Sequence, residues 1–426
     1  MTFLENSLRM MAKILPLSFF DLGFRMLAPI KTLERWMEGV ETIRFRKRGE
    51  PKRILVISDI HLGDAILIQS FISALKQAFP NLELTYFYQA KAAPIIRGNP
   101  HVDRHLAYFG SSGRPSLSEC QKLKDISETS DFNLILNFCH ALPSSIFKFS
   151  RALVVQPIQI IGNVMRAYYL NNQKAHVLFH LDRYAHELAQ KMSSPGGFRF
   201  KPGTNFTGGE IYLTQRASRE AQDIQARWKL NPESRKIMIN PDSSSPLTFI
   251  PFNFQSALLR GVLSVQNSTV LMCCGYNFPK IEEELIKEIP SNLKDKIVVV
   301  PKDVPLDVQA AMMDGCDMFI TGDTGPLHMA AAHKTILDSD NEFRNRTAVV
   351  GLFGATSAKV YGYDSFIKNY LPASQAARSK SFEGRPSCKN LICMDDKSFL
   401  NCRKGRCFEG LSTARVIEYV RDYFSS

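Results

Sequence analysis

The sequence predicts an α/β protein with two successive Rossmann-like domains that face a cleft, preceded by an N-terminal helical arm. Three observations support the two domains. Short apolar runs alternate with helical patterns, the alternation stops at one segment rich in glycine and proline, and it then resumes. Alternating strands and helices form parallel sheets. A chain of 426 residues is long enough for two domains of ordinary size.

The first domain is predicted to span residues 51–205. A strong helical pattern follows its first apolar run, because apolar residues recur on one face from Ile68 to Phe79 before Pro80 ends it. Its predicted strands are 54–57, 82–88, 134–138 and 153–155.

The second domain is predicted to span residues 206–380. The glycine- and proline-rich segment 194–209 reads as a linker, and a helical stretch over 218–228 follows it. The predicted strands are 237–239, 270–272, 297–300, 318–320 and 348–353. Residues 381–426 would then form a cysteine-rich loop and a final helix over 412–423.

The composition indicates a folded protein with an anionic partner. Hydrophobic residues make up 45% of the chain and charged residues 22%, which excludes disordered and fibrous classes. A formal net charge of +12 favours a nucleotide, a nucleic acid or an acidic membrane surface. The chain carries no motif that reads RNA or DNA, so we expect no nucleic-acid partner.

The N-terminal arm, residues 1–50, is neither a clean signal peptide nor a spanning helix. Its apolar run over 14–30 is interrupted by Pro16, Asp21, Arg25 and Pro29. One or two short amphipathic helices are predicted, followed by a basic cluster. Such an arm suits attachment to an anionic membrane face, or it packs on the body of the protein.

A turn near residue 322 has the pattern of a phosphate site. The apolar run 318–320 ends in Gly322-Asp323-Thr324-Gly325, and Pro326 opens a small-residue helix that carries His328. Asp or Thr as N-cap followed by Pro is a helix start signal. Open backbone N–H groups and the helix dipole favour an anion there. The same pattern also fits an ordinary capped helix.

A second polar turn, ending in His61-Leu62-Gly63-Asp64, follows the first predicted strand. Gly63 permits a close approach, and an Asp64 carboxylate at a helix N-terminus stays ionised and can accept a proton from a hydroxyl. Asp64 could instead serve only as an N-cap. Asp59 and His61 near this turn also resemble the start of a dinuclear metallophosphoesterase, but the further ligands that two metals need are missing.

Four cysteines crowd near the C-terminus, in the order Cys388, Cys393, Cys402 and Cys407. Four thiols could hold a structural zinc or iron, although the spacing is loose for zinc, and a disulfide pair or free thiols remain open. The other five cysteines are scattered, which favours a reducing cytoplasm. No catalytic cofactor is expected.

The ordered set of motifs resembles the family-nine glycosyltransferases, which include the ADP-heptose:lipopolysaccharide heptosyltransferases. The matching stretches are Arg53-Ile54-Leu55-Val56-Ile57, Leu62-Gly63-Asp64, Ala78-Phe79-Pro80, Gly98-Asn99-Pro100-His101-Val102-Asp103, Asn240-Pro241, Ser243-Ser244-Ser245-Pro246-Leu247, Gly322-Asp323-Thr324-Gly325-Pro326-Leu327-His328 and Leu352-Phe353-Gly354-Ala355-Thr356.

The resemblance implies a GT-B fold and an inverting transferase without a catalytic metal. The first domain would take a lipopolysaccharide-core or other glycan acceptor, and the second an ADP-heptose-like nucleotide-sugar. Asp64 would be the general base, with His61 and Gly63 on the acceptor side. The donor would contact Ser243, Ser244, Ser245, Thr248, Asp323, Thr324, Gly325 and His328. The enzyme would work in the cytoplasm, peripheral to the inner membrane.

One departure from the family pattern concerns the leaving phosphates. Relatives place a lysine or arginine after the serine loop, and Thr248 stands at that position here. Losing such a charge could weaken transition-state stabilisation by roughly a few kcal/mol, unless Arg260 or Lys280 replaces it. The alternative is a catalytically weak or inactive family member that binds nucleotide-sugar or glycolipid as a scaffold.

Overall fold

The computed structural model describes the body of the chain. The described residues are 51–58, 61–109, 115–139, 144–147, 150, 152–155, 176–192, 209–228, 231, 233–243, 248–273, 280–337, 347–364, 379–384 and 406–425. The predicted N-terminal arm, almost all of the linker, Ser244, Ser245 and three of the four clustered cysteines lie outside them. Residues 51–189 and 199–426 belong to one compact unit, while 1–50 and 190–198 are assigned to another.

The first half of this unit is a parallel sheet of five strands in the order β3-β2-β1-β4-β5. Its strands are β1 (Arg53–Ile57), β2 (Glu83–Gln89), β3 (Arg104–Tyr108), β4 (Leu134–Asn137) and β5 (Leu153–Val155). The central strand β1 is buried from Ile54 onward, because it reads as one continuous apolar run. The four predicted strands are confirmed. The edge strand β3 was missed because its Arg104 and His105 interrupt the apolar pattern.

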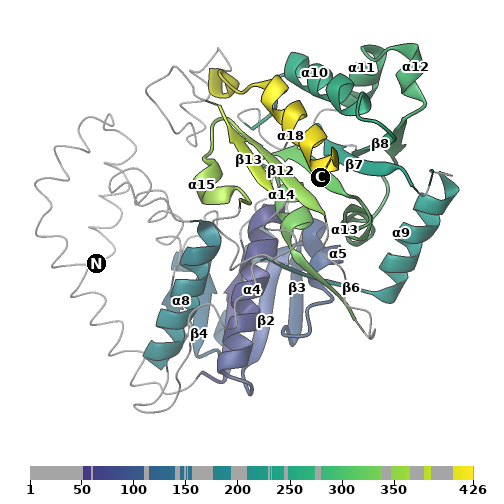
Figure 1. Ribbon diagram of the computed structural model, residues 1–426. Helices are drawn as coiled ribbons and strands as arrows, with labels where there is room; N and C mark the ends of the chain where they lie inside the picture. Colours follow the sequence, from purple (N-terminus) through teal and green to yellow (C-terminus); the bar gives the residue numbers. More distant parts are fainter. Residues whose placement is uncertain are drawn as a thin grey trace, which may run out of the picture. The chain divides into compact units, whose positions relative to one another are not determined.

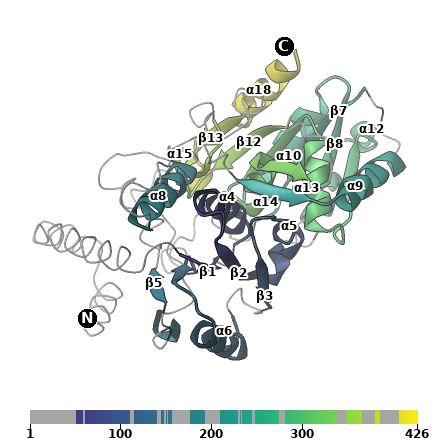
Figure 2. The same ribbon diagram turned by 90° about the horizontal axis from the view of Figure 1, so that it is seen from below.

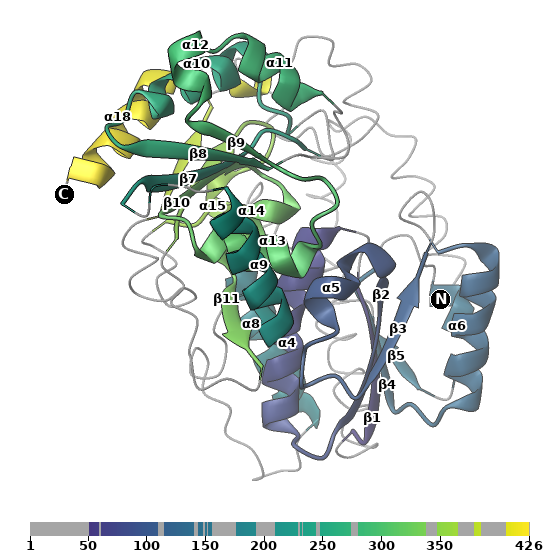
Figure 3. The same cartoon turned by 90° about the vertical axis from the view of Figure 1, so that its right-hand side faces the viewer.

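Helices cover both faces of the first sheet. Leu123 of α6 packs on one face with Leu55 and Ile57, and Figure 3 shows α4 on the opposite face. The helical elements of this half are α4 (Leu62–Ala78), η1 (Ala90–Ala92), α5 (Ala93–Ile96), α6 (Leu117–Thr129), η2 (Ser144–Phe147) and α8 (Val177–Met192). As predicted, α4 ends just before Pro80.

The second half is a parallel sheet of six strands in the order β13-β12-β10-β7-β8-β9. Its strands are β7 (Arg235–Asn240), β8 (Ser268–Cys273), β9 (Ile297–Val300), β10 (Met318–Gly322), β12 (Ala348–Phe353) and β13 (Lys380–Glu383). The five predicted strands are confirmed. β13 was missed because three of its four residues are polar or charged.

The core of the second half lies between this sheet and α10, α11 and α18, with α13 and α14 on the other face (Figures 1 and 3). The helical elements are α9 (Gln215–Arg227), α10 (Phe252–Leu263), α11 (Ile281–Lys287), α12 (Ser291–Lys294), α13 (Leu306–Asp314), α14 (Gly325–Ala331), α15 (Ala358–Tyr361), η4 (Arg406–Phe408) and α18 (Thr413–Ser425). Of the helices that the structure describes, none has the length and apolar content needed to cross a bilayer.

A two-stranded parallel sheet joins the halves, and the sequence did not predict it. β6 (Glu210–Leu213) pairs with β11 (His333–Ile336), which directly follows α14. β6 also packs against α4 and α5 of the first half. In Figures 1 and 2, α4 and α14 lie side by side, in agreement with their tertiary contacts.

Candidate functional site

The amino-terminal turns of α4 and α14 touch each other. A Cβ atom on Gly63 would lie only 2.5 Å from the His328 Cδ2 atom, and one on Gly325 would lie 2.8 Å from the Leu62 Cβ. Real Cβ atoms do not approach so closely, so glycine at both positions permits the contact. The two motifs singled out in the sequence, about 260 positions apart, are therefore neighbours in space.

Asp64 is the third residue of α4, and the N-cap residue is His61. The alternative that Asp64 serves only as an N-cap is therefore wrong. A carboxylate in the first turn of a 17-residue helix is stabilised in its ionised form by the helix dipole. Burial raises the pKa of Tyr86 on β2, and the Asp64 charge contributes to that shift. His61 is exposed beside this turn.

α14 begins as predicted, with Thr324 as N-cap and Pro326 in its first turn. The Thr324 hydroxyl does not cap the helix; it lies 3.2 Å from the Thr321 hydroxyl instead. The Leu327 N–H donates to the Thr324 carbonyl. Among the described residues, the N–H groups of Thr324 and Gly325 have no acceptor, so both can donate to a ligand.

Asn240, at the carboxyl end of β7, holds the turn before α14 in place through hydrogen bonds of its side-chain amide. Its Nδ2 donates to the Asp242 carbonyl at 3.1 Å, to the Thr321 hydroxyl at 3.0 Å and to the Thr324 hydroxyl at 3.4 Å. One buried amide thus connects two neighbouring strand ends. Asn240 was part of the family pattern, but sequence alone gave it no role.

Ser243 and Thr248 lie at the same edge of the sheet. The Asp242 carboxylate accepts from the Ser243 N–H at 2.8 Å, and the Ser243 and Thr248 hydroxyls lie 2.5 Å apart. The Thr248 carbonyl would be 3.0 Å from a Cβ on Gly322. Thr248, which follows the serine loop in the chain, therefore lies against Gly322, directly before the α14 turn.

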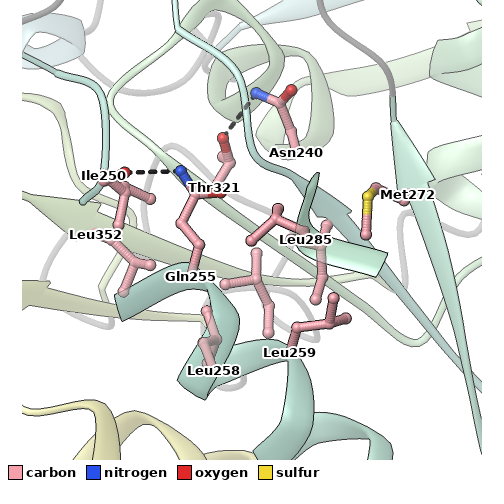
Figure 4. A pocket seen from close by; sticks show the side chains of 11 residues that line it. Asn240, Ile250, Gln255, Leu258, Leu259, Met272, Leu285, Thr321 and Leu352 are labelled. Carbon is pink, nitrogen blue, oxygen red and sulfur yellow. Dashed lines mark hydrogen bonds between the residues drawn. The ribbon is translucent and has the colours of Figure 1, made fainter. Parts of the chain in front are cut away.

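Gln255 of α10 holds both ends of the serine loop. Its Nε2 donates to the carbonyls of Ile250 at 2.7 Å and Pro241 at 3.1 Å. Figure 4 shows this side chain beside a small, largely apolar cavity under Asn240 and Thr321. The cavity leaves only about 10 Å³ for the centre of a water molecule, so it cannot hold a nucleotide-sugar. Gln255 could have been noticed in the sequence as a polar residue on an apolar helical face.

Three ionisable side chains gather around the α14 turn, of which His328 and Tyr363 are buried and Asp323 is partly buried. The His328 Nδ1 lies 2.8 Å from the Tyr363 hydroxyl, and its Nε2 is 4.0 Å from the Asp323 carboxylate. Burial lowers the pKa of His328 to about 4 and raises that of Tyr363, so both are neutral at pH 7. The Asp323 carboxylate favours the tautomer with a proton on His328 Nε2, in which Tyr363 donates to Nδ1. Nothing in the sequence pointed to Tyr363.

Burial also raises the pKa of Asp323 to about 6, and the Thr356 hydroxyl offsets part of this effect. A raised carboxyl pKa favours folding at low pH, and that contribution disappears as the pH rises from about 4 through 6. Ionised Asp323 therefore costs roughly 3 kcal/mol of folding free energy at neutral pH.

We predict that Asp323→Asn removes this pH dependence. Urea unfolding of the wild type and the variant at pH 4 and pH 7.5 measures it. As the pH rises from 4 to 7.5, the free energy of unfolding of the variant should increase by roughly 3 kcal/mol relative to that of the wild type. An equal difference in the free energy of unfolding at both pH values would contradict the assignment.

Arg260 and Lys280 are the two residues that could replace the cation missing at position 248, and they lie at different edges of the second sheet. Arg260 is in the last turn of α10 and donates to the Glu288 carbonyl, so it lies at the edge away from Asn240. Lys280 is exposed and caps the start of α11, after the carboxyl end of β8. Of these two, only Lys280 follows the carboxyl end of a strand of the second sheet.

The cysteine cluster is described only at Cys407, which is buried in the core of the second half. Within the described part of the chain, no group of three or more His, Cys, Asp or Glu side chains could hold a metal ion. Cys388, Cys393 and Cys402 lie outside the described residues, so the structural metal stays a prediction.

Comparison with known proteins gives a family match for the second half of the chain. Residues 210–370 match the family model described as glycosyltransferase family 9 (heptosyltransferase). This part of the chain is a glycosyltransferase family 9 domain. No match was found among curated protein sequences.

Solved structures agree with the family 9 domain in fold. A family 9 glycosyl transferase from Veillonella parvula has 19% identity and a TM-score of 0.63, and the match covers 88% of this chain and 98% of that one. The E. coli ADP-heptose lps heptosyltransferase II has 15% identity, the same coverage and a TM-score of 0.54. An E. coli heptosyltransferase with ADP-2-deoxy-2-fluoro heptose has 12% identity, coverage of 87% and 99%, and a TM-score of 0.50.

The family 9 domain confirms the predicted family and enzyme class, a glycosyltransferase, and the structural matches confirm the predicted α/β fold class. The roles of the individual site residues and the domain boundaries stay predictions.

Proposed function

We propose that this family 9 glycosyltransferase moves heptose or a similar sugar from a nucleotide-sugar to a glycan acceptor, with inversion and without a catalytic metal. The observation that carries the proposal is the contact between the amino ends of α4 and α14. It brings the first turn of α4, which carries Asp64, against the turn of Thr324 and Gly325, whose N–H groups have no acceptor among the described residues and suit a pyrophosphate.

In the proposed reaction, Asp64 accepts the proton of the acceptor hydroxyl as its oxygen attacks the anomeric carbon. The bond from that carbon to the diphosphate oxygen breaks, and its electron pair leaves with the nucleoside diphosphate. The N–H groups of Thr324 and Gly325 stabilise the charge that develops on the leaving group. Asp323 would accept from sugar hydroxyls, and neutral His328 would donate from Nε2.

The donor proposed is ADP-heptose-like, and the acceptor is a lipopolysaccharide core or a related glycolipid. The heptosyltransferases of similar fold are described with ADP-heptose and ADP. The net charge of +12 suits an enzyme that handles anionic donors at the inner membrane surface. Lys280 would supply part of the positive charge missing at Thr248.

A thermal-shift panel tests the donor site. We expect an ADP-sugar to raise the melting temperature, with UDP-, GDP- and dTDP-sugars as comparisons, because a ligand at 100 times its Kd adds about 2.7 kcal/mol. If no nucleotide-sugar raises the melting temperature, the donor proposal fails. Donor binding without transfer to any lipopolysaccharide-core acceptor would favour the scaffold alternative.

A further inference from the structure

A buried polar network connects α4 to β6, in a part of the molecule with no role in the proposed chemistry. The Glu210 carboxylate accepts from the Ser73 hydroxyl at 2.5 Å and from the Tyr212 hydroxyl at 2.8 Å. Gln69 Nε2 donates to the Glu210 carbonyl at 2.8 Å. Gln69 is fully buried, and Ser73 and Glu210 are 1% and 7% exposed. Buried polar groups are costly unless paired, so their pairing holds β6 at one position along α4.

The Gly98-Asn99-Pro100-His101 motif packs onto the same strand. A Cβ on Gly98 would lie 2.5 Å from the Tyr212 carbonyl oxygen, so only glycine permits this approach. Asn99 Nδ2 donates to Gln69 Oε1 at 3.4 Å, and the His101 ring contacts that of Tyr212. This motif was singled out in the sequence without a role, and the structure places it at the α4–β6 contact.

The polar network is connected, through α4 and through β6, to the contact between the amino-terminal turns of α4 and α14. Gln69 and Ser73 lie on the same helix as Asp64, five and nine residues further along. β6 pairs with β11, which follows α14 after one residue, and Gly209 lies against both Ile66 of α4 and Ala332. Fixing β6 on α4 therefore also fixes α14 on α4.

We propose that Gln69, Ser73, Glu210 and Tyr212 form a seam that positions Asp64 against the donor turn. The four are positioning residues: they touch neither proposed substrate and act through Asp64. The distance between base and pyrophosphate cradle is then set by packing within the protein, before any ligand binds. This inference rests on the proposed function for the role of Asp64, but the seam itself makes a prediction about structure alone.

The structural test is amide hydrogen exchange on a Gln69→Leu/Tyr212→Phe variant. This variant keeps the side-chain volumes but loses five hydrogen bonds, three of Gln69 and two of the Tyr212 hydroxyl. Exchange should accelerate at least tenfold at Ala65, Leu327 and Ala332, whose N–H groups pair within the first turn of α4 and in α14. Protection in β1 and β2 should be unchanged. Equal protection at the first three sites would overturn the proposal, whether or not the protein transfers sugar.

The kinetic test uses a double-mutant cycle with Asp64. The Gln69→Leu/Tyr212→Phe variant should have a kcat at least tenfold lower and a donor Kd changed less than twofold. In an Asp64→Ala background, the same two substitutions should not lower kcat further. An equal loss in both backgrounds would show a merely structural role. Gln225→Leu is the matched control, because Gln225 also donates to a carbonyl, that of Met312, but lies between α9 and α13. It should leave kcat unchanged.

Discussion

Replacing Asp64 by alanine is expected to lower kcat by roughly 10²- to 10⁴-fold, the range that general base catalysis contributes. Donor binding should be nearly unchanged, because the proposed pyrophosphate site is the turn before α14, not α4. Turnover and the donor-induced thermal shift, measured on the same preparation, separate the two effects. Unchanged turnover would remove Asp64 as the base.

Two further variants at this position sharpen the test. Asp64→Asn keeps the size of the side chain but cannot accept a proton, so it should be as slow as alanine. Asp64→Glu keeps the carboxylate one methylene further out and should recover part of the rate. A slow Asp64→Glu with a fast Asp64→Asn would point to packing against the α14 turn instead of proton transfer.

Replacing Lys334 by methionine is expected to destabilise the fold by about 3–5 kcal/mol. Lys334 is fully buried, and its Nζ donates to the carbonyls of Ala330 at 3.1 Å and Ala332 at 3.2 Å, at the end of α14. It also lies 3.7 Å from the Asp314 carboxylate. Burial lowers the pKa of Lys334, and Asp314 raises it in part. Methionine would leave that carboxylate buried without its cation.

Urea unfolding measures this loss. Lys287→Met is the matched control, because Lys287 is exposed and its replacement should change the free energy of unfolding by less than about 0.5 kcal/mol. Adding Asp314→Asn to Lys334→Met should recover part of the stability, since the uncompensated charge is removed. A loss below 1 kcal/mol for Lys334→Met would contradict a stabilising role for the pair.

Most of the two large sheets could be predicted from sequence because their strands are buried on both faces. Such strands read as continuous apolar runs, as in Ile54–Leu55–Val56–Ile57 of β1. Two of the strands that were missed, β6 and β11, carry polar residues whose burial depends on distant partners. Glu210 is tolerated in β6 because Ser73 and Tyr212 donate to it, and Lys334 in β11 because helix carbonyls accept from it and the Asp314 carboxylate lies nearby.

For the site, the motifs could be predicted from the sequence, but the residues that hold them in place could not. The glycines at 63 and 325 indicated close approach, but a single sequence cannot show that each lies against the other's helix. Tyr363 and Asn240 act through hydrogen bonds to residues 35 and 81 positions away, and the sequence alone does not show these partners. Which residues meet at the site is decided by the tertiary structure and cannot be predicted from a single sequence.

The β6–β11 pairing has a consequence for the order of events during synthesis. Glu210 is paired with His333, which is made 123 residues later, or roughly 6–25 s at ordinary elongation rates. The first sheet is complete before either strand emerges from the ribosome. α4 can therefore hold β6 through Gln69 and Ser73 while its partner strand is still unmade, and a variant that loosens this contact would leave the half-made chain with an exposed, unpaired strand edge.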